Sequence, residues 1–251
     1  LLTLRPKVLI ISSTIDPVQR IWAFYGRKLG IKIVTIQHGV YSSLSSPYVL
    51  ERNITDYYFS INTEQSKILK NLIPINKHRH LYSKDSFFYQ IPTNKKIRIC
   101  FLGSDHERYG NKGKKNKEKV IQIYLRLIQL LKESDIPDYD LIYKKHPSEK
   151  SLGQLEQLIT VVNNIEFNKV DIFFGIASTM LIKLASENRC TIQVSSSKMR
   201  LDSYENFGFC KTIEIEKFHD STRELFMKKK IKIPCLKQNN INKKLINILN
   251  D

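Results

Sequence analysis

The pattern of apolar and polar positions predicts an α/β protein from the start of the chain. An apolar run at residues 7–13 has the length of a strand, residues 15–29 place apolar side chains at helical spacing, and residues 31–36 form a second β-rich run. A strand, a helix and a strand within about 30 residues fit one crossover of a parallel sheet. A short strand at residues 56–60 and a helix at residues 63–71 continue the alternation. We therefore expect a parallel sheet with helices packed on it.

A second alternating region follows residues 78–94, whose mixed polar and aromatic composition predicts a domain linker. We expect two Rossmann-like lobes with a cleft between them: a partial N-terminal lobe at residues 1–90 and a C-terminal lobe, ending in a helix, at residues 91–251. In the second lobe the expected strands are residues 97–102, 140–143, 170–174 and 191–194, the expected helices are residues 120–131, 152–162, 178–186 and 241–249, and a polar loop is expected at residues 103–119.

The composition excludes several classes of protein. The 251 residues include 12 Tyr and 12 Phe and are 41% hydrophobic, which is enough apolar surface for packed domains rather than a disordered chain. Only 9 Gly and 8 Pro argue against a collagen-like or low-complexity chain. No apolar run approaches the ~18–20 residues of a membrane-spanning helix, and the four cysteines form no CxxC pair. We therefore expect a soluble or peripheral protein of the reducing cytoplasm.

The charge balance predicts an anionic partner. The chain has 41 Lys and Arg against 24 Asp and Glu, a formal net charge of +17. Nucleic acid, phospholipid headgroups and a nucleotide diphosphate would all be attracted. The sequence has no RNP-type aromatic signature, C2H2 spacing or basic recognition helix. Specific nucleic-acid binding is therefore not expected, although a basic nucleic-acid-binding protein stays open as the alternative from another functional class.

The first polar cluster, Gln37-His38-Gly39, follows the strand at residues 31–36. A histidine released by a glycine at a strand's carboxyl end can project its imidazole into a cleft and take a proton from an attacking hydroxyl. The alternative for so short a motif is a histidine that only caps a turn by hydrogen bonding.

The second cluster is Lys144-Lys145-His146-Pro147, after the strand at residues 140–143. Proline fixes the backbone beyond the imidazole, so the lysines and His146 are held at the strand tip, where they suit a phosphate. Of the two lysines, Lys145 is expected to bind the donor. An ordinary basic turn is the alternative.

The third cluster lies between the strand at residues 170–174 and the helix at residues 178–186. Gly175 lets a ligand approach, Ser178 and Thr179 supply hydroxyls, and the start of the helix favours an anion. Simple capping of the helix by Ser178 is the alternative. One further pair, Gly103-Ser104 after the strand at residues 97–102, is a candidate phosphate-binding loop.

The order of these segments resembles the GT-B glycosyltransferases of bacterial surface polymers that use cytidine-nucleotide donors. These include CDP-glycerol polyglycerophosphate transferases and capsule transferases that use CMP-Kdo or CMP-nonulosonic acids. The matching segments are residues 35–39, 55–60, 146–147, 178–179 and 180–190. The HG, HP and S-[ST] motifs are each short, so the specificity of the resemblance lies in their order and in their strand-end placement.

The resemblance implies a GT-B fold with an acceptor-side N-terminal lobe and a C-terminal lobe that binds the nucleotide sugar. By residue, it implies His38 as the catalytic base, His146 with Pro147 as contacts to the donor phosphate or cytidine, and Ser178 with Thr179 as phosphate-binding hydroxyls. Two departures keep both subfamilies open. The acidic motif that supplies the catalytic base in the sialyltransferases is absent, although Asp16 could act as the base instead. Lys183 stands at a position where the polyol-phosphate transferases usually have an acidic residue.

The implied reaction is transfer of a sugar, a nonulosonic acid or Kdo, from a CMP-linked donor to a hydroxyl of a polysaccharide or lipid-linked glycan. No DxD motif or His/carboxylate cluster predicts a metal site, and no cofactor is expected beyond the donor substrate. A basic loop at residues 108–119 and a lysine-rich segment could hold the protein on an anionic inner leaflet, with a solvated basic face as the alternative. The lysines of that segment are Lys228, Lys229, Lys230 and Lys232.

Overall fold

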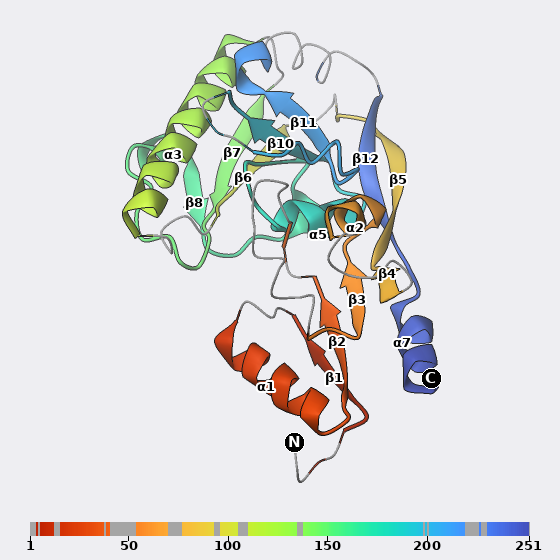
Figure 1. The fold of residues 1–251 in the computed structure, drawn as a ribbon. Coiled ribbons are helices and arrows are strands. Elements are labelled where there is room, and N and C mark those ends of the chain that lie inside the picture. The colour runs from red at the N-terminus through yellow and green to blue at the C-terminus, as the bar shows by residue number, and fades with distance from the viewer. Residues whose placement is uncertain are drawn as a thin grey trace. The chain divides into compact units, whose positions relative to one another are not determined.

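The chain folds into two compact units. The computed structural model describes residues 4, 6–12, 16–37, 39–40, 54–69, 77–92, 96–104, 110–134, 138–197, 199, 201–218, 226 and 230–250. One unit consists of Leu1–Lys84 with Lys237–Asp251, and the other of Asp85–Leu236 (Figure 1).

The first unit is built on a four-stranded parallel sheet in the order β1-β2-β3-β4. Three of its strands and both early helices confirm the expected alternation, whereas β4 lies in the segment that was expected to be a linker. Its strands are β1 (Val8–Ile11), β2 (Lys32–Ile36), β3 (Tyr57–Ser60) and β4 (His78–His80), and its helices are α1 (Pro17–Lys28), α2 (Thr63–Leu69) and α7 (Ile241–Asn250).

The C-terminal helix α7 belongs to this first unit, which corrects its assignment to the C-terminal lobe. Ile248 is buried in one cluster with Val34 of β2 and Phe59 of β3, and Lys32 Nζ donates a hydrogen bond to the Ile248 carbonyl at 3.2 Å. The amphipathic pattern of residues 241–249 predicted the helix itself, but burial against residues about 200 positions earlier decides where it packs.

The second unit contains a six-stranded parallel sheet in the order β11-β10-β9-β6-β7-β8. From β6 the chain adds β7 and β8 on one side, and from β9 it adds β10 and β11 on the other, which is the strand order of a doubly wound sheet. Its strands are β6 (Ile97–Leu102), β7 (Tyr139–Lys144), β8 (Thr160–Val162), β9 (Ile172–Gly175), β10 (Thr191–Ser195) and β11 (Lys211–Glu214), and its helices are α3 (Gly110–Glu133), α4 (Leu155–Leu158) and α5 (Met180–Ser186).

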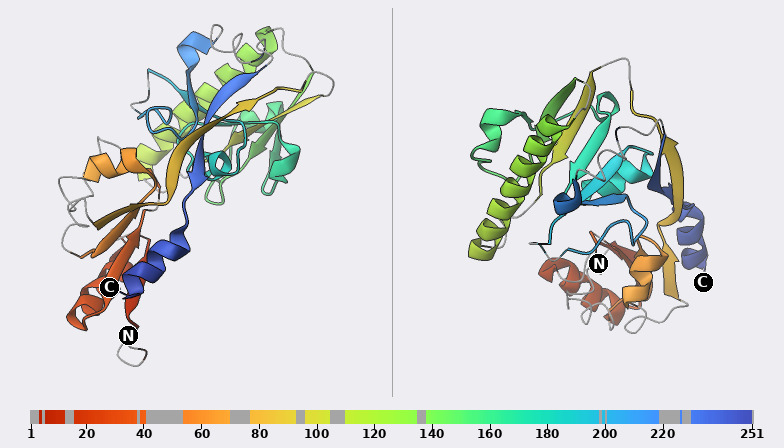
Figure 2. Two further views of the ribbon diagram at one scale, coloured as in Figure 1. Left: turned by 90° about the vertical axis from the view of Figure 1, so that its right-hand side faces the viewer. Right: turned by 90° about the horizontal axis from the view of Figure 1, so that it is seen from above.

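Helix α3 lies along the sheet of the second unit (Figure 2), and aromatic side chains hold it against β6 and β7. The ring of Tyr124 on α3 stacks on Phe101 of β6 with centroids 5.0 Å apart, and it meets Tyr143 of β7 edge to face at 5.8 Å. The Tyr124 hydroxyl also donates to the Leu102 carbonyl at 2.8 Å, so the helix is tied to the last residue of β6. These contacts hold the carboxyl ends of β6 and β7 in place.

Three expectations for local structure were wrong. Residues 110–119 extend α3 rather than continue the polar loop, because lysine and glutamate are good helix formers even without an apolar face. The β-branched residues of β8 form an edge strand inside the stretch 152–162 that was expected to be one helix, of which only α4 is helical. The expected linker at residues 78–94 instead contributes strand β5 (Tyr82–Tyr89), which pairs with β12 (Ile231–Gln238).

Candidate functional site

A cavity of about 300 Å³ lies at the carboxyl ends of the central strands of the second unit. It sits where β6 and β9 are neighbours although they are not consecutive, the point at which doubly wound sheets bind their ligands. Its lining residues are Leu102, Gly103, Lys144, His146, Pro147, Ser178, Thr179, Met180 and Lys183. The cavity therefore brings together residues from the second and third sequence-predicted clusters and from the Gly103-Ser104 pair.

The His146-Pro147 turn is held by its own hydrogen bonds. The Glu149 backbone N–H donates to the His146 carbonyl at 3.0 Å, and the Ser148 N–H donates to His146 Nδ1 at 3.2 Å. The Ser148 hydroxyl lies 2.8 Å from the same ring nitrogen. Because Nδ1 accepts from a backbone N–H, a neutral ring carries its proton on Nε2. His146, which lines the cavity, can then act as a hydrogen-bond donor toward a ligand.

Buried Glu149 anchors this turn, and the sequence reading missed it. Glu149 Oε2 accepts from the His146 backbone N–H at 2.7 Å, and Oε1 accepts from the Tyr143 hydroxyl at 2.8 Å. Burial, followed by the neighbouring Tyr124 and Glu149, raises the pKa of Tyr143 well above the usual tyrosine value, so its hydroxyl stays protonated as a donor. The signal in the sequence was an acid three residues beyond the histidine in a turn.

Gly103 makes room for this arrangement. A Cβ atom at residue 103 would overlap Glu149 Oε2 and would lie 2.6 Å from the His146 nitrogen and 3.0 Å from the Lys144 carbonyl oxygen. The first of these atoms belongs to a carboxylate whose two oxygens each accept a hydrogen bond, and the others belong to the backbone, so none of them moves aside easily. Gly103 is thus required by the close approach of the His146-Pro147 turn, and it also lines the cavity.

The Ser178-Thr179 segment contributes both of its residues to the cavity lining. Helix α5 begins at Met180, two residues later than the expected start, with Thr179 as its N-cap. Within the described residues, no side-chain hydrogen bond from Thr179 caps this helix. Ser178 is 7% exposed. The two residues thus stand at the cavity, and the hydroxyl of Thr179 is not used to cap α5.

Three other predicted donor-site residues do not line the cavity. Lys145 Nζ donates to the Lys150 carbonyl at 2.8 Å. Gly175 faces Leu181, whose side chain would lie within 2.9 Å of an added Cβ, so this glycine serves helix packing. Ser104 is buried next to Gly103, and its Oγ has no hydrogen-bond partner among the described residues.

Lys144 and Lys183 are the lysines at the cavity. The sequence reading chose Lys145 from the adjacent pair at the end of β7. Successive residues of a strand point to opposite faces, so only one lysine of such a pair can face a given site. The sequence alone does not say which.

In the first unit, the predicted base His38 lies outside the described residues, but its neighbours are described. Gln37 is buried, and its Nε2 donates to the Gly39 carbonyl at 2.9 Å and to Gln65 Oε1 at 2.6 Å. Its Oε1 accepts from the Ile61 backbone N–H at 2.9 Å. Gly39 has φ 83°, a left-handed conformation that favours glycine. The turn thus depends on Gln37 and Gly39, whatever the role of His38.

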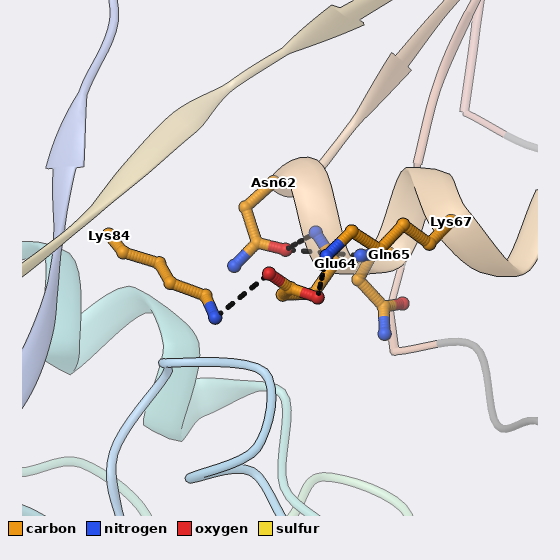
Figure 3. Close-up of polar contacts among 5 residues, drawn as sticks. All are labelled: Asn62, Glu64, Gln65, Lys67 and Lys84. Carbon is orange, nitrogen blue, oxygen red and sulfur yellow. Dashed lines mark hydrogen bonds and ion pairs between the residues drawn. The ribbon is translucent and has the colours of Figure 1, made fainter. Parts of the chain in front are cut away.

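Helix α2 supports this turn through Gln65. Asn62 Oδ1 accepts from the backbone N–H groups of Glu64 at 3.1 Å and Gln65 at 3.2 Å, which caps the helix (Figure 3). The Glu64 carboxylate pairs with Lys67 at 2.9 Å and with Lys84 at 3.0 Å. The hydrogen bond from Lys67, and then that from Lys84, lowers the pKa of Glu64. These contacts fix the start of α2 beside the turn.

Asp16, the alternative predicted base, is the N-cap of α1. Its Oδ1 accepts from the Gln19 backbone N–H at 2.9 Å. Asp16 follows β1 in the chain as Gln37 follows β2, and these two strands are parallel neighbours. The structure thus gives Asp16 a helix-capping contact.

No described part of the chain contains three or more His, Cys, Asp or Glu side chains grouped to hold a metal ion. The four cysteines are buried as free thiols. Burial raises the pKa of the Cys100 thiol to about 12, which disfavours the reactive thiolate. Among the described helices, none is long and apolar enough to cross a membrane.

Comparison with known proteins identifies the fold. No family model and no curated protein matches the chain. The UDP-GlcNAc 2-epimerase of Methanocaldococcus jannaschii in complex with UDP-GlcNAc and UDP aligns with 91% of this chain at 14% identity, with a TM-score of 0.60. The S. aureus MnaA co-structure with UDP aligns with 89% of the chain at 15% identity, with a TM-score of 0.56.

The chain spans 71% of the first of these structures and 66% of the second. At such low identity the similarity shows the fold alone. The protein has an α/β fold with parallel sheets, as the sequence pattern predicted, and it is of the GT-B type, as the resemblance implied.

Proposed function

We propose that the chain is part of a glycosyltransferase that moves a sugar, a nonulosonic acid or Kdo, from a CMP-activated donor to a hydroxyl of a surface glycan. One observation carries the proposal. Residues 103, 146, 147, 178 and 179, separated by up to 76 positions in the sequence, line one cavity at the switch point of a doubly wound sheet. Two lysines join them, so the cavity offers cations and hydroxyls to a phosphate.

In this proposal the donor phosphate occupies the cavity. The oxygen of the acceptor hydroxyl forms a bond to the anomeric carbon as the bond from that carbon to the phosphate oxygen breaks, and the bonding electron pair leaves with the nucleotide. Lys144, Lys183 and the Nε2–H of His146 stabilise the negative charge that develops there. The hydroxyl's proton passes to a base, a role that the resemblance to the GT-B transferases assigns to His38, with Asp16 as the alternative.

The first experiment measures binding of CMP by calorimetry in single variants of the purified chain. We expect Lys144→Ala to weaken binding about tenfold or more, because a cation beside the phosphate is lost. Lys145→Ala is the matched control, since its ammonium bonds to the Lys150 carbonyl and does not line the cavity. Equal effects of the two substitutions would contradict the assigned site, as would the absence of any CMP binding by the folded protein.

Turnover tests the catalytic role of His146. Loss of one preorganised donor to the leaving group should lower the transfer rate roughly 100- to 1000-fold. Transfer from a CMP-linked donor by the purified protein is measured through the CMP that it releases, and the His146→Ala variant is compared with Lys145→Ala. Near-normal turnover by a folded His146→Ala variant would remove His146 from the mechanism.

A nucleotide-sugar epimerase is the second candidate, because the two structures reported above hold UDP or UDP-GlcNAc and share this fold. An epimerase should be protected against heat by UDP rather than by CMP and should convert a UDP-sugar without an acceptor.

Two other functions make different predictions. A CDP-glycerol-type polyol-phosphate transferase would instead be protected by CDP-glycerol and would release CMP on adding glycerol phosphate to an acceptor. A protein that binds nucleic acid should bind oligonucleotides tightly in a salt-sensitive manner and transfer nothing from a cytidine donor.

A further inference from the structure

Gln193 is a fully buried side chain of β10 that uses its whole amide in hydrogen bonds. Its Nε2 donates to the Ile176 carbonyl at 3.2 Å and to the Asp202 carbonyl at 3.2 Å. Its Oε1 accepts from the Tyr204 backbone N–H at 2.7 Å and from the Thr212 hydroxyl at 2.9 Å. Both N–H groups and both lone pairs of the amide therefore have partners.

These partners admit one orientation of the Gln193 amide. A carbonyl oxygen only accepts and a backbone N–H only donates, so exchanging the amide nitrogen and oxygen would set Oε1 against two carbonyls. Each of those buried contacts would then be repulsive and unsatisfied. A satisfied buried network of this kind is rigid, and it holds the Ile176 carbonyl in one place.

Ile176 opens the segment that carries two of the cavity-lining residues. Gly175, the last residue of β9, lies opposite Gln193 in the register of β9 and β10, so the amide reaches the first residue beyond the strand. Ser178 and Thr179 follow within three residues and line the cavity at the carboxyl ends of the strands. The hydrogen bond from Gln193 therefore fixes the direction in which the chain leaves β9 toward the cavity.

We propose that Gln193 is a positioning residue for the donor phosphate. This role rests on the proposed function, in which Ser178 and Thr179 bind that phosphate. Gln193 does not line the cavity, and its hydrogen bonds go to the protein, so it acts through the Ile176 carbonyl. A displacement of about 1 Å in groups that hold a ligand is enough to weaken their interaction strongly. The sequence analysis did not single out this residue.

A purely structural role is the alternative, because the same amide also binds the backbone of residues 202 and 204. The matched control is Thr212→Val, which removes one hydrogen bond to Gln193 Oε1 and leaves the Ile176 contact in place. Calorimetry with CMP compares this control with Gln193→Met, which keeps a similar volume without the amide. We expect Gln193→Met to weaken CMP binding about tenfold and Thr212→Val to weaken it less than about twofold. Each titration is run well below the thermal midpoint of the variant, measured by circular dichroism.

Double-mutant cycles identify the part of the cavity through which Gln193 acts. Thr179→Val removes a hydroxyl of the positioned segment, so in that background Gln193→Met should weaken CMP binding by less than about threefold. Lys144→Ala removes a cation carried by β7, so in that background the effect of Gln193→Met should stay about tenfold. A structural role gives the same factor in both backgrounds.

A more conservative variant serves if Gln193→Met does not fold. Gln193→Glu keeps the volume and the oxygen that accepts from the Tyr204 N–H, but it loses the donor to the Ile176 carbonyl. The introduced charge acts on CMP in every background, so the cycle with Thr179→Val cancels that uniform effect.

Inorganic pyrophosphate is titrated in parallel, because it reports on a phosphate site whatever the nucleoside. A parent chain that binds pyrophosphate but not CMP would contradict the proposed donor, and the Gln193 variants are then compared with pyrophosphate. Three results would overturn the role of Gln193: unchanged affinity in its variants, an equal loss in Thr212→Val, and the same loss with and without Thr179→Val. A folded parent chain that binds neither ligand would refute the phosphate site and the role of Gln193 together.

Discussion

Replacing Gly103 by alanine should disturb the cavity through the residues behind it. The added methyl group would overlap the Glu149 carboxylate and would lie 2.6 Å from the His146 nitrogen, closer than real Cβ contacts come. The turn must shift, and the hydrogen bond from the His146 N–H to Glu149 is strained or lost. Overpacking and a buried donor without its acceptor together predict a loss of about 2–6 kcal/mol in the free energy of unfolding.

A double-mutant cycle tests this origin of the loss. Glu149→Ala alone should destabilise the protein, because the His146 N–H and the Tyr143 hydroxyl lose their acceptor. Adding Gly103→Ala to that variant should cost less than it does in the parent, since the worst overlap is gone. We expect the double variant to be at least about 1 kcal/mol more stable than additivity predicts.

Urea unfolding followed by circular dichroism gives the free energies, and calorimetry with CMP reports on the cavity. The matched control is Gly153→Asn, because Gly153 has φ 57°, has no neighbour within 4 Å of an added Cβ, and asparagine tolerates this left-handed conformation. The reasoning is refuted if Gly103→Ala is as stable as the parent chain. It is also refuted if the effects of Gly103→Ala and Glu149→Ala simply add.

Three further predictions concern the first unit. Burial, and then the charges of neighbouring Lys244, His78 and Arg79, lowers the pKa of His80. The unfolded chain therefore binds the proton more readily, and stability is lost as the pH falls below the ordinary histidine value of about 6.5. Urea unfolding of a His80→Asn variant over a pH series should show a shallower loss, and an unchanged slope would argue against this assignment. Asn62→Ala should cost about 1 kcal/mol by removing the cap of α2, measured in the same way, and no loss would mean that the cap is dispensable. Lys84→Met should change stability by less than about 1 kcal/mol, because its partially exposed ion pair with Glu64 is screened by solvent, and a larger loss would show that the pair is stronger than its exposure implies.

Much of the candidate site could be located from the sequence because strand ends are local features. The strands that end before Gly103, His146 and Ser178 each predicted a ligand-binding residue at a carboxyl end, and these three residues line one cavity. Glu149 was missed because its importance comes from burial beneath the turn, which depends on Tyr143 and Gly103 folding over it. The role of His38 stays a prediction, because that residue lies outside those described.

The sequence by itself determined the alternation of strands and helices, the parallel character of the sheets and the polar residues at the strand ends. These follow from periodicities of two and of 3.6 residues, which neighbouring side chains set within a few positions. The tertiary structure alone decided that β5 pairs with β12, that α7 packs in the first unit, and that Lys144 rather than Lys145 lines the cavity. Each of these depends on contacts between segments far apart in the chain, and no local pattern carries that information.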